Sequence, residues 1–255
     1  QGMRSIPLEQ WIGKDDAFPV KGHALDSKLH SVPDCQSILK KAAVERLKSV
    51  YHTSWFTESG AIHPLHFTIR KNIATIYLDT SGIGLHKRGY RKSANAAPIK
   101  ETLAAGIVDL ARVHSDSVVC DPFCGSGTIL IEAAFKALRI APGMHRRFLA
   151  EKWAQIPESV WKEARSEAVA RIQRDATFTA IGSDIDEAAI ALTEENCRRA
   201  GVKPRIRLVQ QDVAEFQPPE GAITICNPPY GERMLEQRSA QQLMRQFGRH
   251  LRFAD

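Results

Sequence analysis

The chain has 255 residues, of which 43% are hydrophobic and 25% charged, as is ordinary for a globular protein. No run of eighteen apolar residues occurs, and the start QGMRSIPLEQ has no hydrophobic signal core, so we expect neither a membrane span nor a secretory signal. Residues 1–100 hold fifteen Lys/Arg and eight Asp/Glu, a net +7, whereas 101–255 hold twenty and twenty-one, a net −1. This asymmetry favours contact between the first part and a polyanion, although a basic surface can also serve solubility alone.

The first part of the chain predicts a small α+β module. Residues 1–33 are rich in turn formers, and 34–50 place apolar residues at helical spacing after a Pro-Asp start signal. The segments 65–69 and 73–79 flank a short Arg-Lys-Asn turn and predict a β-hairpin. Nothing before residue 34 is expected to complete the module. We therefore place a module at 1–80, followed by a Gly-rich basic linker at 81–98.

The second part, 99–255, predicts an α/β domain in which strands alternate with helices. The expected helices are 99–113, 128–138, 186–200 and 239–253, and the expected strands are 117–121, 179–184, 206–210 and 222–226. An insertion rich in Arg, Trp and Glu occupies 139–176. Apolar strands that alternate with amphipathic helices indicate a mostly parallel, Rossmann-like sheet covered on both faces. Since such sheets usually have more than four strands, we expect further strands after Asp255.

The cysteines and histidines predict neither a metal site nor a catalytic thiol. The five cysteines are an odd number without a CxxC pair, which is typical of free thiols in a reducing compartment, the cytoplasm. The nine histidines show no metal-ligand spacing and no adjacent nucleophile. We therefore expect no metal ion and no catalytic triad.

The motif DPFCGSGT, residues 121–128, lies between a predicted strand and a predicted helix. Gly125 and Gly127 permit a tight turn that a ligand can approach, and the helix that follows points its N–H groups at that ligand. The motif lacks the GK[ST] ending of a phosphate-binding loop and the third glycine of a dinucleotide fingerprint. A glycine turn led by an acid fits a nucleoside with a cationic tail, whose ammonium group Asp121 can hold.

Two further acids follow the next strands. Asp184 closes the strand 179–184 and can accept hydrogen bonds from ribose hydroxyls, whereas we expect its rival Asp186 to cap the next helix. Asp212 occupies the equivalent place one strand further on and can accept a hydrogen bond from an adenine amino group. The alternative for Asp212 is a plain loop acid.

Asn227-Pro228-Pro229-Tyr230 follows the last predicted strand. The prolines fix the backbone, and the Asn227 side-chain carbonyl and the Pro228 carbonyl can accept both hydrogens of an exocyclic amino group. Tyr230 offers a ring on which a base can stack. These contacts aim the nitrogen lone pair at an electrophile, so the chemistry depends on orientation more than on a general base. As a bare tetrapeptide the motif is also compatible with a simple turn.

This set of motifs resembles class I S-adenosylmethionine-dependent amino-methyltransferases. Further segments, among them HKRGYR, APIKETLAA, IAPG and NPPYGERM, resemble bacterial THUMP-domain RNA methyltransferases, close to the ribosomal large-subunit guanine-N2 group. The resemblance implies that residues 1–80 are the later part of a THUMP RNA-binding module. It also implies that a ferredoxin-like companion precedes residue 1 and that final strands follow Asp255.

The resemblance also assigns roles to individual positions. It implies cofactor contacts for Asp121, Cys124, Gly125, Gly127, Asp184, Asp212, Val213 and Pro98, the last within a stretch that closes over the methionine end. Asn227, Pro228 and Tyr230 would receive the target base. Lys87, Arg88 and Arg91 would contact RNA, or form a solvated basic loop.

The sequence thus predicts an S-adenosylmethionine-dependent enzyme that methylates the N2 amine of a guanine in structured RNA. Ribosomal 23S RNA is the expected substrate. Four alternatives stay open: a transfer RNA guanine, the N6 amine of adenine in DNA, a protein glutamine, and a catalytically idle RNA-binding assembly factor.

Overall fold

The computed structural model describes residues 2–91, 99–229 and 237–248, which form two compact units. The first unit comprises residues 1–84 and 147–163, and the second comprises 85–146 and 164–255. The segment 147–163, which lies inside the predicted insertion, therefore belongs to the first unit although the second unit surrounds it in the sequence. Residues 85–91, predicted as part of the linker, belong to the second unit.

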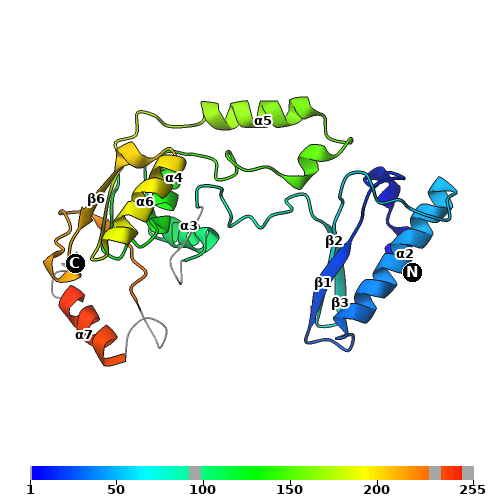
Figure 1. Ribbon diagram of the computed structural model, residues 1–255, viewed down its shortest axis with the longest axis horizontal. Helices are drawn as coiled ribbons and strands as arrows, with labels where there is room; N and C mark the ends of the chain where they lie inside the picture. The colour runs from blue at the N-terminus through cyan, green and yellow to red at the C-terminus, as the bar shows by residue number, and fades with distance from the viewer. Residues whose placement is uncertain (1, 92–98, 230–236, 249–255) are drawn as a thin grey trace. The chain divides into compact units, whose positions relative to one another are not determined.

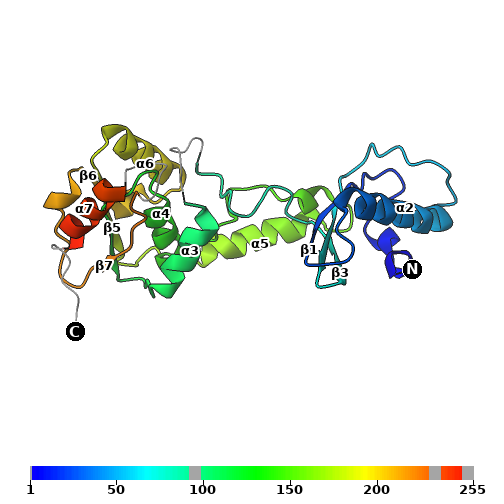
Figure 2. The ribbon, with the colours of Figure 1, turned by 90° about the horizontal axis from the view of Figure 1, so that it is seen from below.

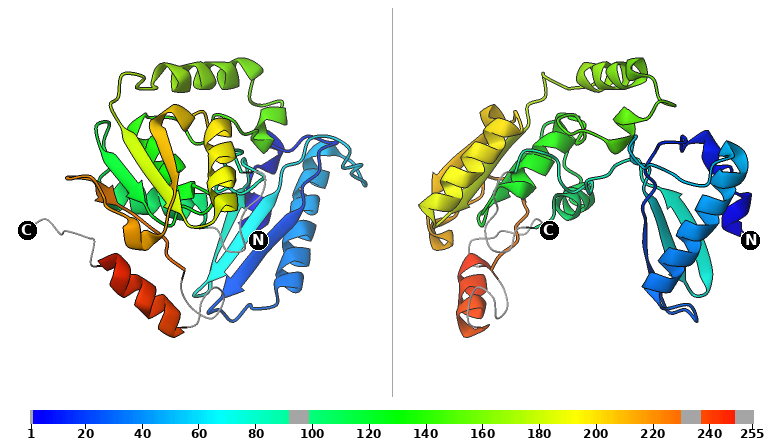
Figure 3. Two further views of the ribbon diagram at one scale, coloured as in Figure 1. Left: turned by 60° about the vertical axis from the view of Figure 1, so that its left-hand side comes forward. Right: turned by 45° about the vertical axis from the view of Figure 1, so that its right-hand side comes forward.

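The first unit is built on a three-stranded sheet with one long helix against it. Its elements before the linker are α1 (Gly2–Ser5), η1 (Leu8–Gln10), β1 (Val20–Leu25), α2 (Val32–Tyr51), β2 (Leu65–Arg70) and β3 (Ile73–Leu78). Strand β2 lies in the centre, parallel to β1 and antiparallel to β3. Figure 3 shows α2 running along one face of this sheet, where Ala43 and Leu47 join Phe67 and Ile69 in one buried core. The predicted helix and hairpin are both present.

Strand β1 was not predicted, because VKGHAL has no run of apolar residues and contains a glycine. Gly22 lies beside Phe67 across the β1–β2 pair, and a Cβ at this position would come within 2.2 Å of the Phe67 carbonyl oxygen. The glycine is therefore required by close approach of the strands. Contrary to the prediction, the segment before residue 34 contributes to the module, because β1 pairs with β2 in its sheet.

The segment 147–163 packs onto the first unit through Trp153. This side chain is only 2% exposed, stacks on the buried His63 ring with the centroids 4.4 Å apart, and donates a hydrogen bond from Nε1 to the Ile62 carbonyl at 3.0 Å. Burial lowers the pKa of His63, and the neighbouring Asp16 opposes this shift. Trp153 is therefore part of the packing of the first unit.

The second unit is a parallel α/β domain. Its strands are β4 (Val118–Asp121), β5 (Thr179–Asp184), β6 (Ile206–Gln210) and β7 (Ile223–Thr224), in the order β6-β5-β4-β7. All three strand pairs are parallel. Its helices are α3 (Glu101–Leu110), α4 (Thr128–Ala137), α6 (Glu187–Arg199) and α7 (Gln237–Gly248), with the short η3 (Lys203–Arg205) and η4 (Val213–Glu215). Figure 1 traces these elements in chain order.

Helical elements cover both faces of this sheet. Val119 and Ala180 pack into a core with residues of α3, α4 and α6, whereas Cys120 and Ile181 face a second cluster with η4 and α7. Figure 2 shows α3 and α4 side by side. The expected α/β fold with a mostly parallel sheet is thereby present, with β5 and β6 at their predicted bounds and β7 shorter than predicted.

The insertion contains η2 (Leu149–Lys152) and α5 (Glu158–Ala170). Helix α5 was not predicted, because it has no buried residue and therefore lacks the apolar periodicity that marks a packed helix. Among the described residues, no helix combines the length and the apolar character needed to cross a membrane.

Candidate active site

The candidate residues lie at the carboxyl edge of the parallel sheet. Asp121 ends β4, Asp184 ends β5, Asp212 follows β6, and Asn227 follows β7 by three residues. The chain runs outward from β4 through β5 to β6 and then returns to the other side of β4 for β7. Such a reversal creates a crevice at the carboxyl ends of the two strands that flank it, where open α/β sheets bind ligands. Asp121 and Asn227 follow those two strands.

The glycine turn is held from behind by two buried residues of α6. The Thr193 hydroxyl donates to the Gly125 carbonyl at 2.8 Å, and the Asn196 side-chain amide donates to the Ser126 carbonyl at 2.9 Å. Gly127 has φ +76°, and a Cβ there would come within 2.6 Å of the Thr193 methyl group. Residues 193 and 196 lie one turn apart, so one helix face fixes both carbonyls. Neither of these two positioning residues was predicted from the sequence.

Asp121 is a buried carboxylate at the head of the turn. It is 1% exposed, and within the described part of the chain the one hydrogen bond to it comes from the Phe123 N–H at 3.1 Å. Burial raises its pKa to about 7, and the charge of Asp184 adds to the shift, although the Phe123 hydrogen bond opposes it. A buried carboxylate is stabilised when a cation pairs with it. This position therefore suits a ligand with an ammonium group.

Asp184 joins the second strand to the glycine turn. One carboxylate oxygen accepts the Gly125 N–H at 3.0 Å, and the other accepts the Asp186 N–H at 3.1 Å. Each oxygen keeps a further lone pair with which it can accept a hydrogen bond from a hydroxyl. Asp186 caps α6 by accepting the Ala188 N–H at 2.9 Å, as expected for the rival acid.

Asp212 caps η4, where its carboxylate accepts the Ala214 N–H at 2.8 Å. The next residue, Val213, is 5% exposed and packs with Phe216 and Phe247. The cap uses one carboxylate oxygen and leaves the other for a ligand donor. Adenine contact by Asp212 and Val213 stays a prediction.

Asn227 and Pro228 are half-buried and follow β7, which pairs with β4 through Val119 and Cys120. The pairing brings the asparagine-led turn and the glycine turn to the same sheet edge. Tyr230, assigned to the same motif, lies outside the described residues, as does Pro98. The base-binding role of this motif stays a prediction.

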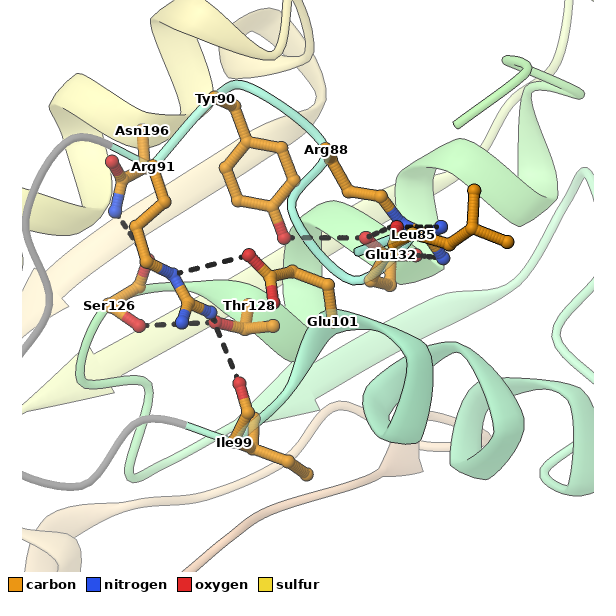
Figure 4. A network of polar contacts seen from close by, with 10 residues as sticks. All are labelled: Leu85, Arg88, Tyr90, Arg91, Ile99, Glu101, Ser126, Thr128, Glu132 and Asn196. Atoms are coloured by element: carbon orange, nitrogen blue, oxygen red, sulfur yellow. Dashed lines mark hydrogen bonds and ion pairs between the residues drawn. The ribbon is translucent and has the colours of Figure 1, made fainter. Parts of the chain in front are cut away.

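Arg88 and Tyr90 bind a buried glutamate in place of facing solvent. The Arg88 guanidinium forms two hydrogen bonds to the Glu132 carboxylate at 3.3 Å, and the Tyr90 hydroxyl donates to the same carboxylate at 3.3 Å (Figure 4). Burial raises the pKa of both Glu132 and Tyr90. The contact fixes the start of the second unit to α4.

Arg91 contacts the first residue of the helix that follows the glycine turn. Its guanidinium donates to the Thr128 hydroxyl and to the Ile99 carbonyl at 3.1 Å, and its Nε lies 3.7 Å from the Glu101 carboxylate (Figure 4). The side chains of Arg88 and Arg91 are 12% and 14% exposed. This geometry favours a positioning role for both, whereas Lys87 is exposed and open to a partner.

Cys124 faces the core. Its sulfur lies 3.8 Å from the Thr193 hydroxyl, its N–H donates to the Ser183 carbonyl, and burial raises its pKa. It supports the turn and is not poised as a nucleophile. Within the described ranges, no group of three or more His, Cys, Asp or Glu side chains is placed to hold a metal ion.

These residues define the class. A parallel α/β sheet with an acid-led glycine turn, a second acid on the next strand and an Asn-Pro turn at the reversal point is the ligand-binding edge of a class I methyltransferase domain. Residues 88–253 match the RMKL-like methyltransferase domain family, and residues 1–79 match the THUMP domain family. The chain therefore belongs to the RMKL-like methyltransferase family, and the expected fold, a Rossmann-like domain preceded by a THUMP module, is confirmed.

Three relatives illustrate the similarity. The chain is 42% identical over 248 residues to "Putative RNA methyltransferase YpsC" of Bacillus subtilis (strain 168), covering 96% of this chain and 64% of that protein. A crystal structure from Listeria monocytogenes str. 4b F2365, described as "a predicted N6-adenine-specific DNA methylase", is 43% identical with a TM-score of 0.90 over 97% of this chain and 66% of the other. The structure of SMU.472, "a putative methyltransferase complexed with SAH", is 34% identical with a TM-score of 0.90 over 98% and 67%. The chain thus spans 64% of the length of this curated relative from Bacillus subtilis.

Proposed function

We propose that this chain is the RNA-binding and catalytic part of an S-adenosylmethionine-dependent RNA methyltransferase that modifies the N2 amine of a guanine, in 23S ribosomal RNA. One observation carries the proposal: Asp121, Asp184, Asp212 and Asn227 lie at or just after the carboxyl ends of four neighbouring parallel strands, at one sheet edge. The THUMP match and the basic first part support RNA as the substrate. The five free cysteines support action in the cytoplasm.

The residues present fit the cofactor. The buried Asp121, with its raised pKa, suits the ammonium group of the methionine part, and Asp184 has lone pairs for the ribose hydroxyls. Asp212 and Val213 are placed to contact adenine at the next strand. The structure of SMU.472 with SAH supports this choice of ligand.

The catalytic part rests on orientation. When bound, S-adenosylmethionine supplies a methyl group on a sulfonium, which transfers to the amine nitrogen and leaves S-adenosylhomocysteine and the proton that the nitrogen loses. Asn227 and the Pro228 carbonyl accept the amine hydrogens and so direct the nitrogen lone pair. Because the amine loses its proton after attack, the site needs no strong base.

Mass spectrometry of nucleosides from purified 23S RNA, 16S RNA and transfer RNA tests the proposal. RNA is compared from cells with the gene, without it, and complemented with Asn227→Ala. We expect N2-methylguanosine in 23S RNA to fall without the gene and to stay low with the variant. A fall in transfer RNA, or a fall in N6-methyladenosine, reassigns the substrate. Unchanged methylation in every fraction, together with no calorimetric binding of S-adenosylhomocysteine, refutes the enzyme and favours an assembly factor.

A further inference from the structure

The three-stranded sheet of the first unit has one face that α2 does not cover. The strand register sorts its side chains into two sets, because residues opposite one another across neighbouring strands point to the same face. The uncovered set forms three cross-strand rows: Lys21, His66 and Tyr77; His23, Thr68 and Thr75; and Leu25, Arg70 and Ile73. All nine are exposed or half-buried, and we call them the open sheet face.

The open sheet face carries positive charge without acids. None of the three strands contains Asp or Glu, whereas the face carries the basic side chains of Lys21 and Arg70 together with His23 and His66. The acid beside it is Asp79, which follows β3 and lies 3.5 Å from His66 Nε2. A face of this kind attracts a polyanion.

Two further lysines add positive charge at the end of the sheet where Arg70 lies. Lys71 lies in the β2–β3 turn, and Lys28 follows the end of β1. Asn72 ties these turns together: its side-chain oxygen accepts the Lys28 N–H at 2.8 Å, and its N–H donates to the Ser27 hydroxyl at 3.0 Å. The two lysines are therefore held near Arg70, with Asp26 as the acid of the β1 turn.

The same face exposes a ring and apolar side chains that no other described residue of the first unit covers. Tyr77 is 49% exposed, Ile73 is 70% exposed and Leu25 is 54% exposed. A flat sheet that presents an aromatic ring among cations is a platform on which unpaired bases stack while phosphates meet the charges.

The surface of α2 lacks this character. Its exposed residues include Asp34 and Glu45 as well as Lys41, while Arg46 and Lys40 form ion pairs with Glu9 and Glu58. Charges of both signs are interspersed there, as on an ordinary solvated helix. Of these two surfaces, the sheet face is therefore the one whose charge complements a polyanion.

We propose that the open sheet face is the surface on which the first unit binds RNA, with a base stacked on Tyr77 and phosphates held by Lys21 and Arg70. The proposal rests on RNA being the substrate class and adds the surface that receives it. The RNA segment on this face is unpaired, because a base can stack on Tyr77 only when it is free of a helix.

Fluorescence anisotropy with a 5′-fluorescein-labelled single-stranded RNA of about twelve nucleotides tests this surface. The variants are Lys21→Glu/Arg70→Glu and Tyr77→Ala, and the matched control is Lys41→Glu/Lys48→Glu on α2, which changes the net charge equally. We expect the sheet pair to weaken binding about 100-fold and to reduce the slope of log affinity against log salt by about 1.4, near 0.7 per lost phosphate contact. Tyr77→Ala weakens binding about tenfold, while Tyr77→Phe retains it because the ring stacks without the hydroxyl.

Several outcomes overturn the proposal: no measurable binding by the unchanged protein, equal losses from the sheet and helix pairs, or no loss from the sheet pair. Light scattering tests whether the open sheet face binds a second copy of the chain instead. If the unchanged protein is a dimer, and the sheet variants dissociate it without changing RNA affinity, the face belongs to a dimer interface. Far-ultraviolet circular dichroism of each variant excludes unfolding, and Tyr77→Phe supplies a second folded comparison. The assay needs no cofactor, so loss of methyl transfer with intact RNA binding refutes the proposed enzyme and leaves this surface standing.

Discussion

Replacing Asp121 by Asn is expected to stabilise the ligand-free protein against unfolding and to lower its affinity for S-adenosylhomocysteine. The pKa of this carboxyl is about 7 in the folded chain, against an ordinary value of 3.8. Because the folded pKa is the higher one, the folded state holds the proton longer, and stability falls as pH rises from about 4 to 7. At about 1.4 kcal/mol per pKa unit, the ionised group costs about 4 kcal/mol above pH 7 and roughly 1.6 kcal/mol at pH 5.

Asn keeps the acceptor for the Phe123 N–H but cannot ionise. We therefore expect the difference in unfolding free energy between Asp121→Asn and the unchanged chain to grow by about 3 kcal/mol from pH 5 to pH 8. Urea unfolding at both pH values measures it. The control is Asp116→Asn, an exposed acid just before the same strand, which should show no such growth.

Calorimetric titration with S-adenosylhomocysteine supplies the second half of the test. The affinity of the unchanged chain should rise by roughly tenfold between pH 6 and pH 8 as Asp121 ionises. In Asp121→Asn it should be flat with pH and about 10- to 100-fold weaker at pH 8, since a charge-assisted hydrogen bond is lost. A variant that is less stable at pH 8, or one with unchanged affinity, would refute this account of Asp121.

Three other substitutions probe the remaining parts. Asn227→Ala should lower kcat by about 100-fold or more with little change in S-adenosylhomocysteine affinity, because its contact is made with the amine; single-turnover methylation and calorimetry separate the two effects. Asn196→Ala should weaken S-adenosylhomocysteine binding by about tenfold, because the Ser126 carbonyl loses its donor; unchanged affinity would show that the turn holds its shape alone. Trp153→Ala should destabilise the first unit by about 3–5 kcal/mol in urea unfolding, whereas Trp55→Ala, at a side chain 77% exposed, should have little effect.

The sequence predicted correctly those strands and helices in which apolar residues recur at a regular spacing. Strands β5 and β6 have their predicted bounds, because buried strands of a parallel sheet are marked by short apolar runs between helices. Strand β1 was not predicted, because its outward residues lie on an uncovered face and are not apolar at regular spacing. Its glycine is required by close contact with Phe67, which lies more than forty residues away in the sequence. Helix α5 was not predicted because none of its residues is buried, so its sequence has no apolar face to mark it.

The candidate site divides in the same way. Each strand-end acid could be identified by its place after an apolar run, since the carboxyl ends of parallel strands share one edge. The two residues that position the glycine turn could not be identified from the sequence. Thr193 and Asn196 resemble ordinary helix residues, and only the folded structure shows them bonded to the Gly125 and Ser126 carbonyls. Arg88 was predicted to be a basic linker residue, because its partner Glu132 lies 44 positions later and nothing in the local sequence indicates that contact.

The interleaving of the two units sets a limit on how the molecule can be divided. A cut after residue 84 would leave 147–163 attached to the catalytic piece, while its binding partners, among them His63, went with the other. Trp153 would then lie bare on one fragment and its receiving site on the other, and exposed aromatic surface of that kind promotes aggregation. Fragments for separate study are therefore better obtained by co-expressing the two pieces, so that Trp153 on one piece can pack against His63 on the other.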